Sequence, residues 1–439
     1  MRRLALHWSL PLAAAWMLTS PLHALPSPAD GRRSLEDLLL EARERRAAAQ
    51  AQLRVQLDGI LAEMAPENRT PTPAEFATLV ERIVKLGAES TPLLVERLDC
   101  AEGATENEKL RARELANALA RMDTTAITSE LLALLNKASP DGQRNVLRVL
   151  ATSSEPERAR EAVAKLFRTA DTSLKQACLR TLLQLGGGAD EALLTEVLGG
   201  TDDNLIELAL DALATARSSA ALEDVRRILG DSRRAARHAW SLMQYFRAQP
   251  ALATPAEALA FAKLAANSSI AADTRVQLMD ALPALKPSLN AEMKRLMEPI
   301  VSSPDRKLHE GALVLLTRLG DKSARKELIK ECDELVDRND RWAESYVRRA
   351  DVLAKIGEDD DAIKDYKQAL VVARNDPSIQ ADTWVKLARA YTRRGKFKEA
   401  AETLRKSPLA DAALKALAED LEFKPLRDSK YGKEAFGLK

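Results

Sequence analysis

The residue types that most often perform catalysis are scarce in this sequence and stand far apart. Its 439 residues hold four histidines and three cysteines, and Cys100, Cys178 and Cys332 each lie in or at the end of a helical pattern. No histidine–cysteine cluster has the spacing of a zinc site. Each cysteine is interpreted as a small apolar core residue, with a single disulfide as the alternative. The sequence therefore predicts no bound metal, no cofactor and no catalytic residue.

Two histidines and two short segments are candidate sites of chemistry. His238 and His309 fall inside helical segments without the partners of an active site, so both are interpreted as structural or surface residues. The glycines at 186–188 lack the Lys-Ser/Thr ending of a phosphate loop and follow a helix, which indicates a turn. The segment "EDDDAIKD" (358–365) lacks the ligand alternation of a calcium loop. Its carboxylates suit the first turn of a helix, where the helix dipole is positive.

Composition limits both the partner and the fold. The chain has 66 basic and 65 acidic residues and a net charge of +1, whereas nucleic-acid binders normally concentrate a basic excess on one face. No nucleic-acid partner is therefore expected. Glycine occurs only 17 times, Ala, Leu, Arg and Glu are abundant, and no alternating strand pattern is present. These features predict an all-α fold.

The N-terminus has the features of a secretory signal peptide. Arg2 and Arg3 precede an apolar stretch from Leu4 to Leu18, and "LHA" ends at Ala24 with a small residue. We predict a signal peptide over residues 1–24, a linker over 25–33, and export to the periplasm or the extracellular space. Retention of the segment as an anchor is the alternative, and no transmembrane segment is expected in the mature chain.

A long helix and a series of shorter ones follow. Residues 34–64 carry apolar side chains at helical spacing, and this helix is expected to lie across the end of the next segment, with pairing to another chain as the alternative. Residues 73–340 show internal similarity. A segment that begins at Asp171 recurs from Asp202 and again from Asp305, and each aspartate is expected to cap a helix. These segments resemble HEAT-type repeats, which implies an array of helical hairpins.

A second repeat type covers residues 341–408. Tyr346, Ala350, Leu353, Gly357, Ala362 and Tyr366 recur 38 residues later as Trp384, Ala388, Tyr391, Gly395, Ala400 and Leu404. This spacing resembles that of tetratricopeptide (TPR) repeats, although the period exceeds the usual length of about 34 residues. Two TPR-type hairpins are predicted, followed by a C-terminal helical cap and tail over residues 409–439. The fold class is thus an α-solenoid with a HEAT-like array, two TPR-type hairpins and a cap.

The TPR resemblance implies a set of binding residues on the first helix of each hairpin. At these positions the sequence has the basic residues Arg348, Lys386, Arg389 and Arg393. The last three lie three and four residues apart, so they share one helix face. Such a stripe could bind an acidic peptide or a carboxylate, with a solvated surface of no dedicated ligand as the alternative. Val347 and Asp351 depart from the pattern of TPRs that clamp chaperone tails.

These sequence features are compatible with three functions. The preferred one is a non-catalytic scaffold of the bacterial cell envelope that binds a protein or peptide partner on the surface of the solenoid. The first alternative is an enzyme built on HEAT-like repeats, similar to lyases or glycosylases, which requires a cleft with convergent carboxylates. The second is a polyanion binder that uses the basic TPR face. The oligomeric state is left open.

Overall fold

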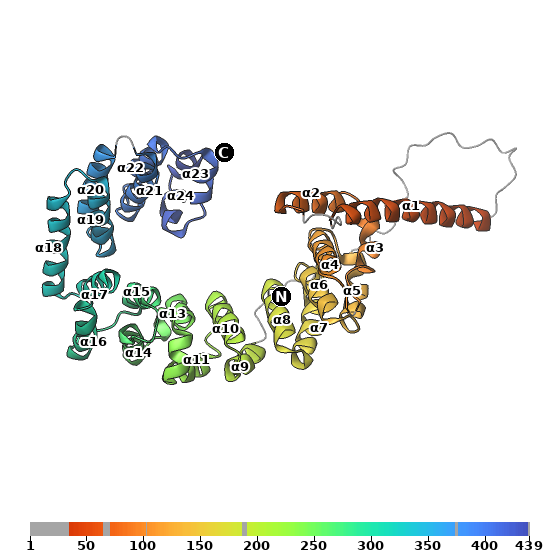
Figure 1. Cartoon of the computed structure of the whole chain (residues 1–439), viewed down its shortest axis with the longest axis horizontal. Helices are drawn as coiled ribbons and strands as arrows, with labels where there is room; N and C mark the ends of the chain where they lie inside the picture. The colour runs from red at the N-terminus through yellow and green to blue at the C-terminus, as the bar shows by residue number, and fades with distance from the viewer. Residues whose placement is uncertain (1–34, 65–70, 102, 187–190, 374–375, 438–439) are drawn as a thin grey trace, which may run out of the picture. The chain divides into compact units, whose positions relative to one another are not determined.

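The computed structural model describes residues 35–64, 71–101, 103–186, 191–373 and 376–437, and these residues form helices, turns and loops without a strand (Figure 1). The prediction of an all-α solenoid is confirmed. The predicted signal peptide and linker lie outside the described residues, as do His7, His23 and the glycines at 187 and 188. The chain divides into two compact units, Met1–Val149 and Leu150–Lys439.

None of the helices in the described part of the chain combines the length and the apolar character that a membrane span requires.

Unit 1 is a set of helices in which a long first helix is followed by shorter ones. They are α1 (Leu35–Met64), α2 (Pro73–Val84), η2 (Ala88–Ser90), α3 (Thr91–Val95), α4 (Glu106–Leu119), η3 (Thr125–Ile127), α5 (Thr128–Leu135) and α6 (Pro140–Leu150). Helix α2 begins with a capping box, in which the Thr72 side chain accepts from the Glu75 backbone N–H and the Glu75 carboxylate accepts from the Thr72 backbone N–H.

Only the last third of α1 packs against the rest of unit 1. Leu57 and Met64 are fully buried against α2 and η2, and Asp58 pairs with Arg97 at 2.6 Å. Leu39 and Val55, by contrast, are 51% and 72% exposed. Thirty residues of helix span about 45 Å, whereas the 12 residues of α2 span about 18 Å. Helix α1 thus packs on the helices that follow through its C-terminal turns, while Leu39 and Val55 remain exposed.

Unit 2 continues as paired helices in two layers. The first part comprises α7 (Pro156–Thr169), α8 (Thr172–Gln184), α9 (Glu191–Gly199), α10 (Asp203–Ala216), α11 (Leu222–Gly230), α12 (Ser232–Arg237), α13 (Ala239–Ala248), η4 (Pro250–Leu252), α14 (Pro255–Ala266), α15 (Ala272–Ala281), η5 (Leu282–Leu285), α16 (Ala291–Val301), α17 (Arg306–Arg318) and α18 (Lys322–Arg338). Helices α8, α10, α13, α15 and α17 contact one another in series, and α9, α11, α14 and α16 form a second series. Figure 1 shows the second layer below the first.

The repeated aspartates cap helices as the internal similarity predicts. The carboxylates of Asp171 and Asp202 accept hydrogen bonds from the backbone N–H three residues ahead, at 2.8 and 2.9 Å. Asp305 accepts from the N–H groups of Lys307 and Leu308 at 2.9 and 3.3 Å. Each cap satisfies donors that have no partner inside the helix. The same residue in each copy therefore fixes where a helix of the repeat begins.

Two hairpins follow that match the predicted TPR spacing. They consist of α19 (Ala343–Lys355) with α20 (Asp359–Val372), and α21 (Pro377–Arg393) with α22 (Phe397–Lys406). The small residues of the pattern lie at the helix contacts and are fully buried: Ala350, Ala362, Ala388 and Ala400. Gly357 and Gly395 form the turns with φ of +85° and +69°, a conformation that a side chain disfavours.

The C-terminal segment packs on the second of these hairpins. It contains α23 (Asp411–Leu417), η6 (Leu421–Phe423), α24 (Lys424–Arg427) and α25 (Gly432–Phe436). Phe423 and Phe436 are fully buried and meet edge to face, with 5.8 Å between ring centroids. They belong to the same apolar cluster as Ala388 and Leu404, so this segment covers the apolar end of the hairpin pair.

Candidate functional site

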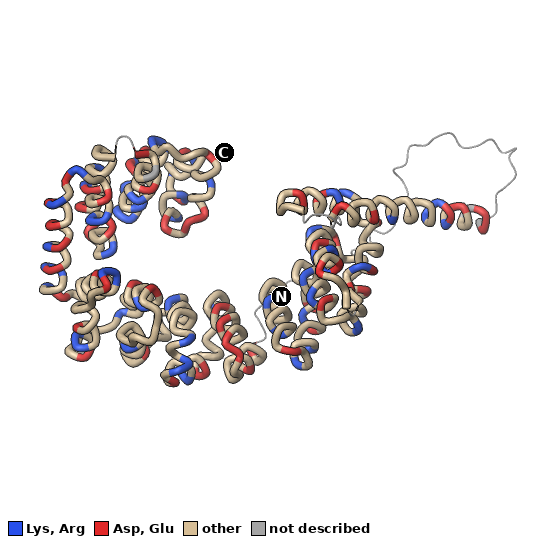
Figure 2. The backbone as a smooth tube through the Cα atoms, viewed as in Figure 1, with Lys and Arg blue, Asp and Glu red and all other residues tan. Residues whose placement is uncertain are grey.

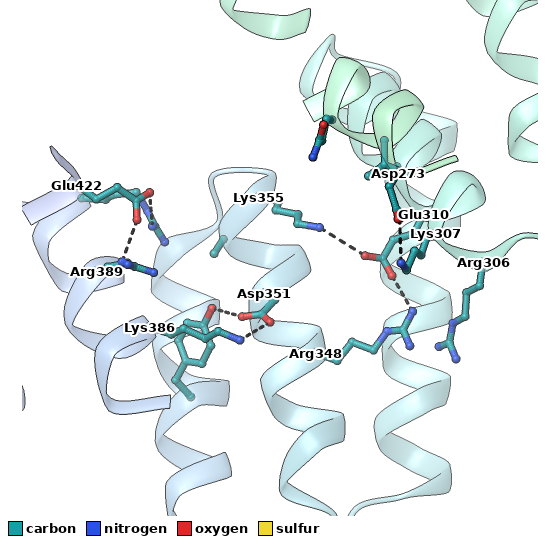
Figure 3. A pocket seen from close by; sticks show the side chains of 16 residues that line it. Asp273, Arg306, Lys307, Glu310, Arg348, Asp351, Lys355, Lys386, Arg389 and Glu422 are labelled. Carbon is teal, nitrogen blue, oxygen red and sulfur yellow. Dashed lines mark hydrogen bonds and ion pairs between the residues drawn. The ribbon is translucent and has the colours of Figure 1, made fainter. Parts of the chain in front are cut away.

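A pocket of about 1030 Å³ lies within unit 2, where the last helices of the array meet the TPR-type hairpins. Its walls come from α15, α17, α19 and α21, with single residues from α20 and η6. Most of the lining side chains are charged, and Figure 3 shows them pointing toward one another across the space between the helices. All four residues predicted to bind a partner, Arg348, Lys386, Arg389 and Arg393, line this pocket.

The helical period explains why these side chains share the pocket. On α19, Arg348, Asp351 and Lys355 follow one another at steps of three and four, which places them on one face. The residues between them, such as Val352 and Leu353, are buried in the opposite face. Helix α21 repeats the arrangement, because Leu387 and Ala390 are buried while the basic residues face the pocket. Core packing thus fixes the orientation of the charged faces.

Each predicted basic residue is already paired with a carboxylate of this chain. Arg348 binds Glu310 at 2.8 Å, and Lys386 binds Asp351 at 2.8 Å and Asp382 at 2.9 Å. The other two basic residues, Arg389 and Arg393, both contact the carboxylate of Glu422 in η6.

Arg389 contacts Asp420 at 2.6 Å and Glu422 at 3.0 Å. Arg393 contacts Asp359 at 2.7 Å and Glu422 at 3.9 Å. The basic stripe on α21 is therefore compensated by carboxylates of the same chain. The neighbouring repeat and the C-terminal segment supply these carboxylates.

Several residues of the pocket were missed by the sequence analysis. Arg306, Lys307 and Glu310 come from α17 and Asp273 from α15, both in the preceding array, and Glu422 comes from the C-terminal segment. Binding residues assigned from the TPR family lie only on the first helix of each TPR-type hairpin. The residues that α15, α17 and the C-terminal segment add to the pocket are therefore not among them. Figure 2 shows both signs of charge on the helices around the pocket.

Burial, hydrogen bonds and ion pairs shift the pKa values of three groups in or beside the pocket. Burial acts to lower the pKa of Lys386, but hydrogen bonds to Asp351 and Asp382 outweigh it and raise the pKa. The pKa of Asp420 is lowered, first by the backbone N–H of Glu422 and also by Arg389. Burial raises the pKa of Tyr366, as does Asp351, which accepts the Tyr366 hydroxyl at 2.7 Å. These lysine and aspartate groups are therefore charged near neutral pH.

Ion pairs involve every carboxylate that lines this pocket. Glycosidase- or lyase-type catalysis needs a carboxyl group whose pKa is raised toward neutrality. The carboxylates that line the pocket are each ion-paired to a lysine or an arginine of this chain. Among the described residues, no group of histidine, cysteine, aspartate and glutamate is arranged to hold a metal ion.

His238, His309 and the three cysteines do not line the pocket. His238 is buried against α10, with Nε2 3.2 Å from Asp203 and Nδ1 3.7 Å from Glu207. Cys100, Cys178 and Cys332 are buried and unpaired, so the alternative of a disulfide is not realised. Burial raises the pKa of Cys178 to about 12, which favours the unreactive thiol.

Comparison with known families identifies the repeats at this site. Residues 343–376 and 381–407 match the tetratricopeptide repeat, and these segments coincide with the two hairpins α19–α20 and α21–α22. The chain thus contains TPR repeats, and TPR folds are typically non-catalytic and suggest an interaction with protein partners. A search of curated proteins finds no match to the chain.

Proposed function

We propose that this protein is a non-catalytic scaffold of the bacterial cell envelope that binds a segment of a partner protein in the pocket between α15 and α21. The observation that carries the proposal is the pocket itself. It contains the four basic residues expected in the groove of the two TPR repeats and is large enough, at about 1030 Å³, for several side chains of a peptide. An acidic partner segment is the more specific form of this proposal.

The charge distribution favours this function over the two alternatives. A polyanion binder gains affinity from many unpaired cations, whereas the cations on α21 are matched by carboxylates of the same chain. An enzyme of the lyase or glycosylase type requires a carboxyl group with a raised pKa in the cleft. Asp211 has such a raised pKa, caused by burial and then by Glu207, but it lies on α10 and does not line the pocket.

Selection of binding peptides tests the proposed function. A displayed library of random dodecapeptides is selected against the purified chain, and binding is then measured with Gln277→Trp, which places a large side chain at the exposed pocket wall. Ala354→Trp is a second variant on the opposite wall. Ala291→Trp, on the exposed start of α16, is the matched control. Circular dichroism checks that each variant keeps its helical content.

The expected result is a set of peptides whose binding is weakened about tenfold or more by both pocket variants and unchanged by the control. Failure to select any peptide, or equal binding to all variants, contradicts the proposal.

Export is a separate part of the proposal and rests on the sequence of residues 1–24. Fusion of residues 1–30 to a reporter that is active only after it forms disulfides tests it, because such bonds form in the periplasm and not in the cytosol. We expect an active reporter, and loss of activity when Leu10 and Leu12 are changed to arginine. An inactive reporter in the unmodified fusion contradicts export.

A further inference from the structure

The ion pairs divide the pocket into two charge groups that share no member. In the first, Glu310 of α17 accepts from Arg348 at 2.8 Å and lies 3.7 Å from Lys355, while Asp273 pairs with Lys307 at 3.0 Å. Arg306 lines the same side of the pocket. The second group surrounds α21 and contains Lys386, Arg389 and Arg393 with their carboxylates: Asp351, Asp359, Asp382, Asp420 and Glu422. Figure 3 shows the two groups on opposite sides of α19.

The two groups carry opposite net charge. The second group sets three cations against five carboxylates, a net charge of −2 for the whole ion-paired group. Of these five carboxylates, Asp351 and Glu422 line the pocket, whereas Asp359, Asp382 and Asp420 pair with the cations without lining it. The first group sets four cations, Arg306, Lys307, Arg348 and Lys355, against Asp273 and Glu310, a net charge of +2. Asp305 is also close, but its carboxylate caps the N-terminus of α17. Counting Asp305 still leaves a cation excess of one.

Two cations of the first group retain capacity for a ligand. Arg306 is exposed, and no carboxylate among the described residues pairs with it. Lys355 has one pairing, to Glu310, at the long distance of 3.7 Å, and its side chain is 45% exposed. An ammonium group can donate three hydrogen bonds and a guanidinium group five. Both residues can therefore bind an incoming carboxylate without breaking a short internal ion pair.

We infer that the acidic part of the partner segment binds at the α17–α19 end of the pocket, through Arg306, Arg348 and Lys355, and not over the basic residues of α21. A carboxylate there forms charge-assisted hydrogen bonds in a region of positive net charge. Over α21, a carboxylate meets Asp351 and Glu422 in the pocket lining, and every cation there is already paired, so the ligand must displace a carboxylate from its cation. The inference rests on the proposed function, because it specifies which end of the same pocket recognises which charge.

Binding of a defined acidic peptide tests the inference. Fluorescence anisotropy is measured with labelled hexaglutamate, amidated at its C-terminus so that only side-chain carboxylates contribute, and with labelled hexalysine of equal length. The variants are Arg306→Gln and Lys355→Gln. Lys398→Gln is the matched control, since Lys398 is exposed on α22 and outside the pocket. Thermal unfolding verifies that the variants are folded.

We expect the unmodified chain, which has both Arg306 and Lys355, to bind hexaglutamate more tightly than hexalysine. Each pocket variant should bind hexaglutamate about fivefold more weakly than the unmodified chain does, and this difference should be smaller at high salt. The Lys398→Gln control should bind hexaglutamate as tightly as the unmodified chain. Hexaglutamate that does not bind, or binds equally to all variants, overturns the inference. Tighter binding of an oligothymidylate of equal charge also overturns it, in favour of the polyanion alternative.

Failure of the inference is distinguishable from failure of the proposed function. Suppose that the library-selected peptides fail to bind Gln277→Trp but bind normally to the Arg306 and Lys355 variants. This result contradicts only the inference that the acidic part of the partner binds at the α17–α19 end of the pocket. A library that yields no peptide contradicts the function itself.

Discussion

Single charged side chains in unit 2 link each repeat to the next. Lys307 pairs with Asp273 and Arg393 with Asp359, each across 34 residues of sequence, and Arg348 pairs with Glu310 across 38 residues. In a solenoid, equivalent positions of neighbouring repeats lie side by side, so a separation of one repeat brings them into contact. The charged residues of the pocket therefore have two roles, because the ion pairs that orient the repeats also determine which cations remain for a ligand.

His309 shows how one residue can make the stability of this junction depend on pH. Its Nδ1 contacts the carbonyl oxygen of Val301 at the end of α16, and its Nε2 lies 2.9 Å from the Glu331 carboxylate on α18. Both acceptors are satisfied together only when both ring nitrogens carry protons. Burial acts to lower the pKa of His309, but the contacts with Val301 and Glu331, and the charge of Glu327, raise it above its ordinary value.

We predict a stabilising effect of His309 that is present at low pH and lost at high pH. Because the pKa is higher in the folded than in the unfolded state, this stability is complete below the unfolded value of about 6.5 and disappears as the pH rises through the folded value. Chemical denaturation of the unmodified chain and of His309→Gln is compared at about pH 6 and about pH 9. The difference in the free energy of unfolding should be about 1 kcal/mol at the lower pH and smaller at the higher pH. A difference that does not change with pH contradicts this assignment.

The sequence predicts the side of the pocket that belongs to the TPR repeats, but not its electrostatic character. Arg348, Lys386, Arg389 and Arg393 could be placed because the helical period and the family pattern fix which face they occupy. Glu422 could not, because it reaches α21 from a short helical turn whose docking depends on tertiary packing. A search for opposite charges one repeat apart could have indicated pairs such as Glu310–Arg348.

At the scale of the elements, local sequence signals predict most helices and some of their contacts. Asp171, Asp202 and Asp305 mark helix starts because a short carboxylate caps free backbone N–H groups regardless of what packs nearby. Helix α1 shows the limit of such signals. Its spacing predicts a helix, but how far it packs depends on the length of α2, which the spacing does not reveal.

The C-terminal segment should stabilise the TPR repeats through its two buried phenylalanines. Replacement of Phe436 by alanine removes a fully buried ring from the cluster with Phe423 and Leu404, and should lower the free energy of unfolding by about 3–4 kcal/mol. Leu421→Ala is the control, because Leu421 is 83% exposed in the same segment and its loss should change stability by less than about 0.5 kcal/mol. Denaturant titration measures both variants. Similar small effects for the two would show that the segment does not stabilise the repeats.

At the scale of the whole molecule, the chain consists of two compact units, and the pocket belongs to the second alone. The low glycine content, the abundance of Ala, Leu, Arg and Glu, and the lack of an alternating strand pattern predict the helical class, because these features extend over the full length of the chain. The boundary near residue 150 could not be predicted, because helical hairpins continue on both sides of it and only the packing between helices differs.

A fragment from Ser153 to Lys439 should therefore fold without the rest of the chain. The fragment retains the contacts among α7–α25, so we expect a helical far-UV circular dichroism spectrum. We also expect a cooperative thermal transition whose midpoint lies within about 5 °C of the midpoint of a transition of the full chain. A fragment that is unfolded, or that melts without cooperativity, contradicts the division into two units.

Hydrogen exchange of the full chain with a library-selected peptide tests the central claim most directly, because it reports where the partner segment binds without altering any residue. Bound peptide should slow exchange in α17, α19 and α21, whose residues line the pocket. The helices α9, α11 and α14 of the second layer should exchange at unchanged rates. Slowed exchange confined to unit 1, or to that second layer, would contradict the claim that this pocket is the binding site.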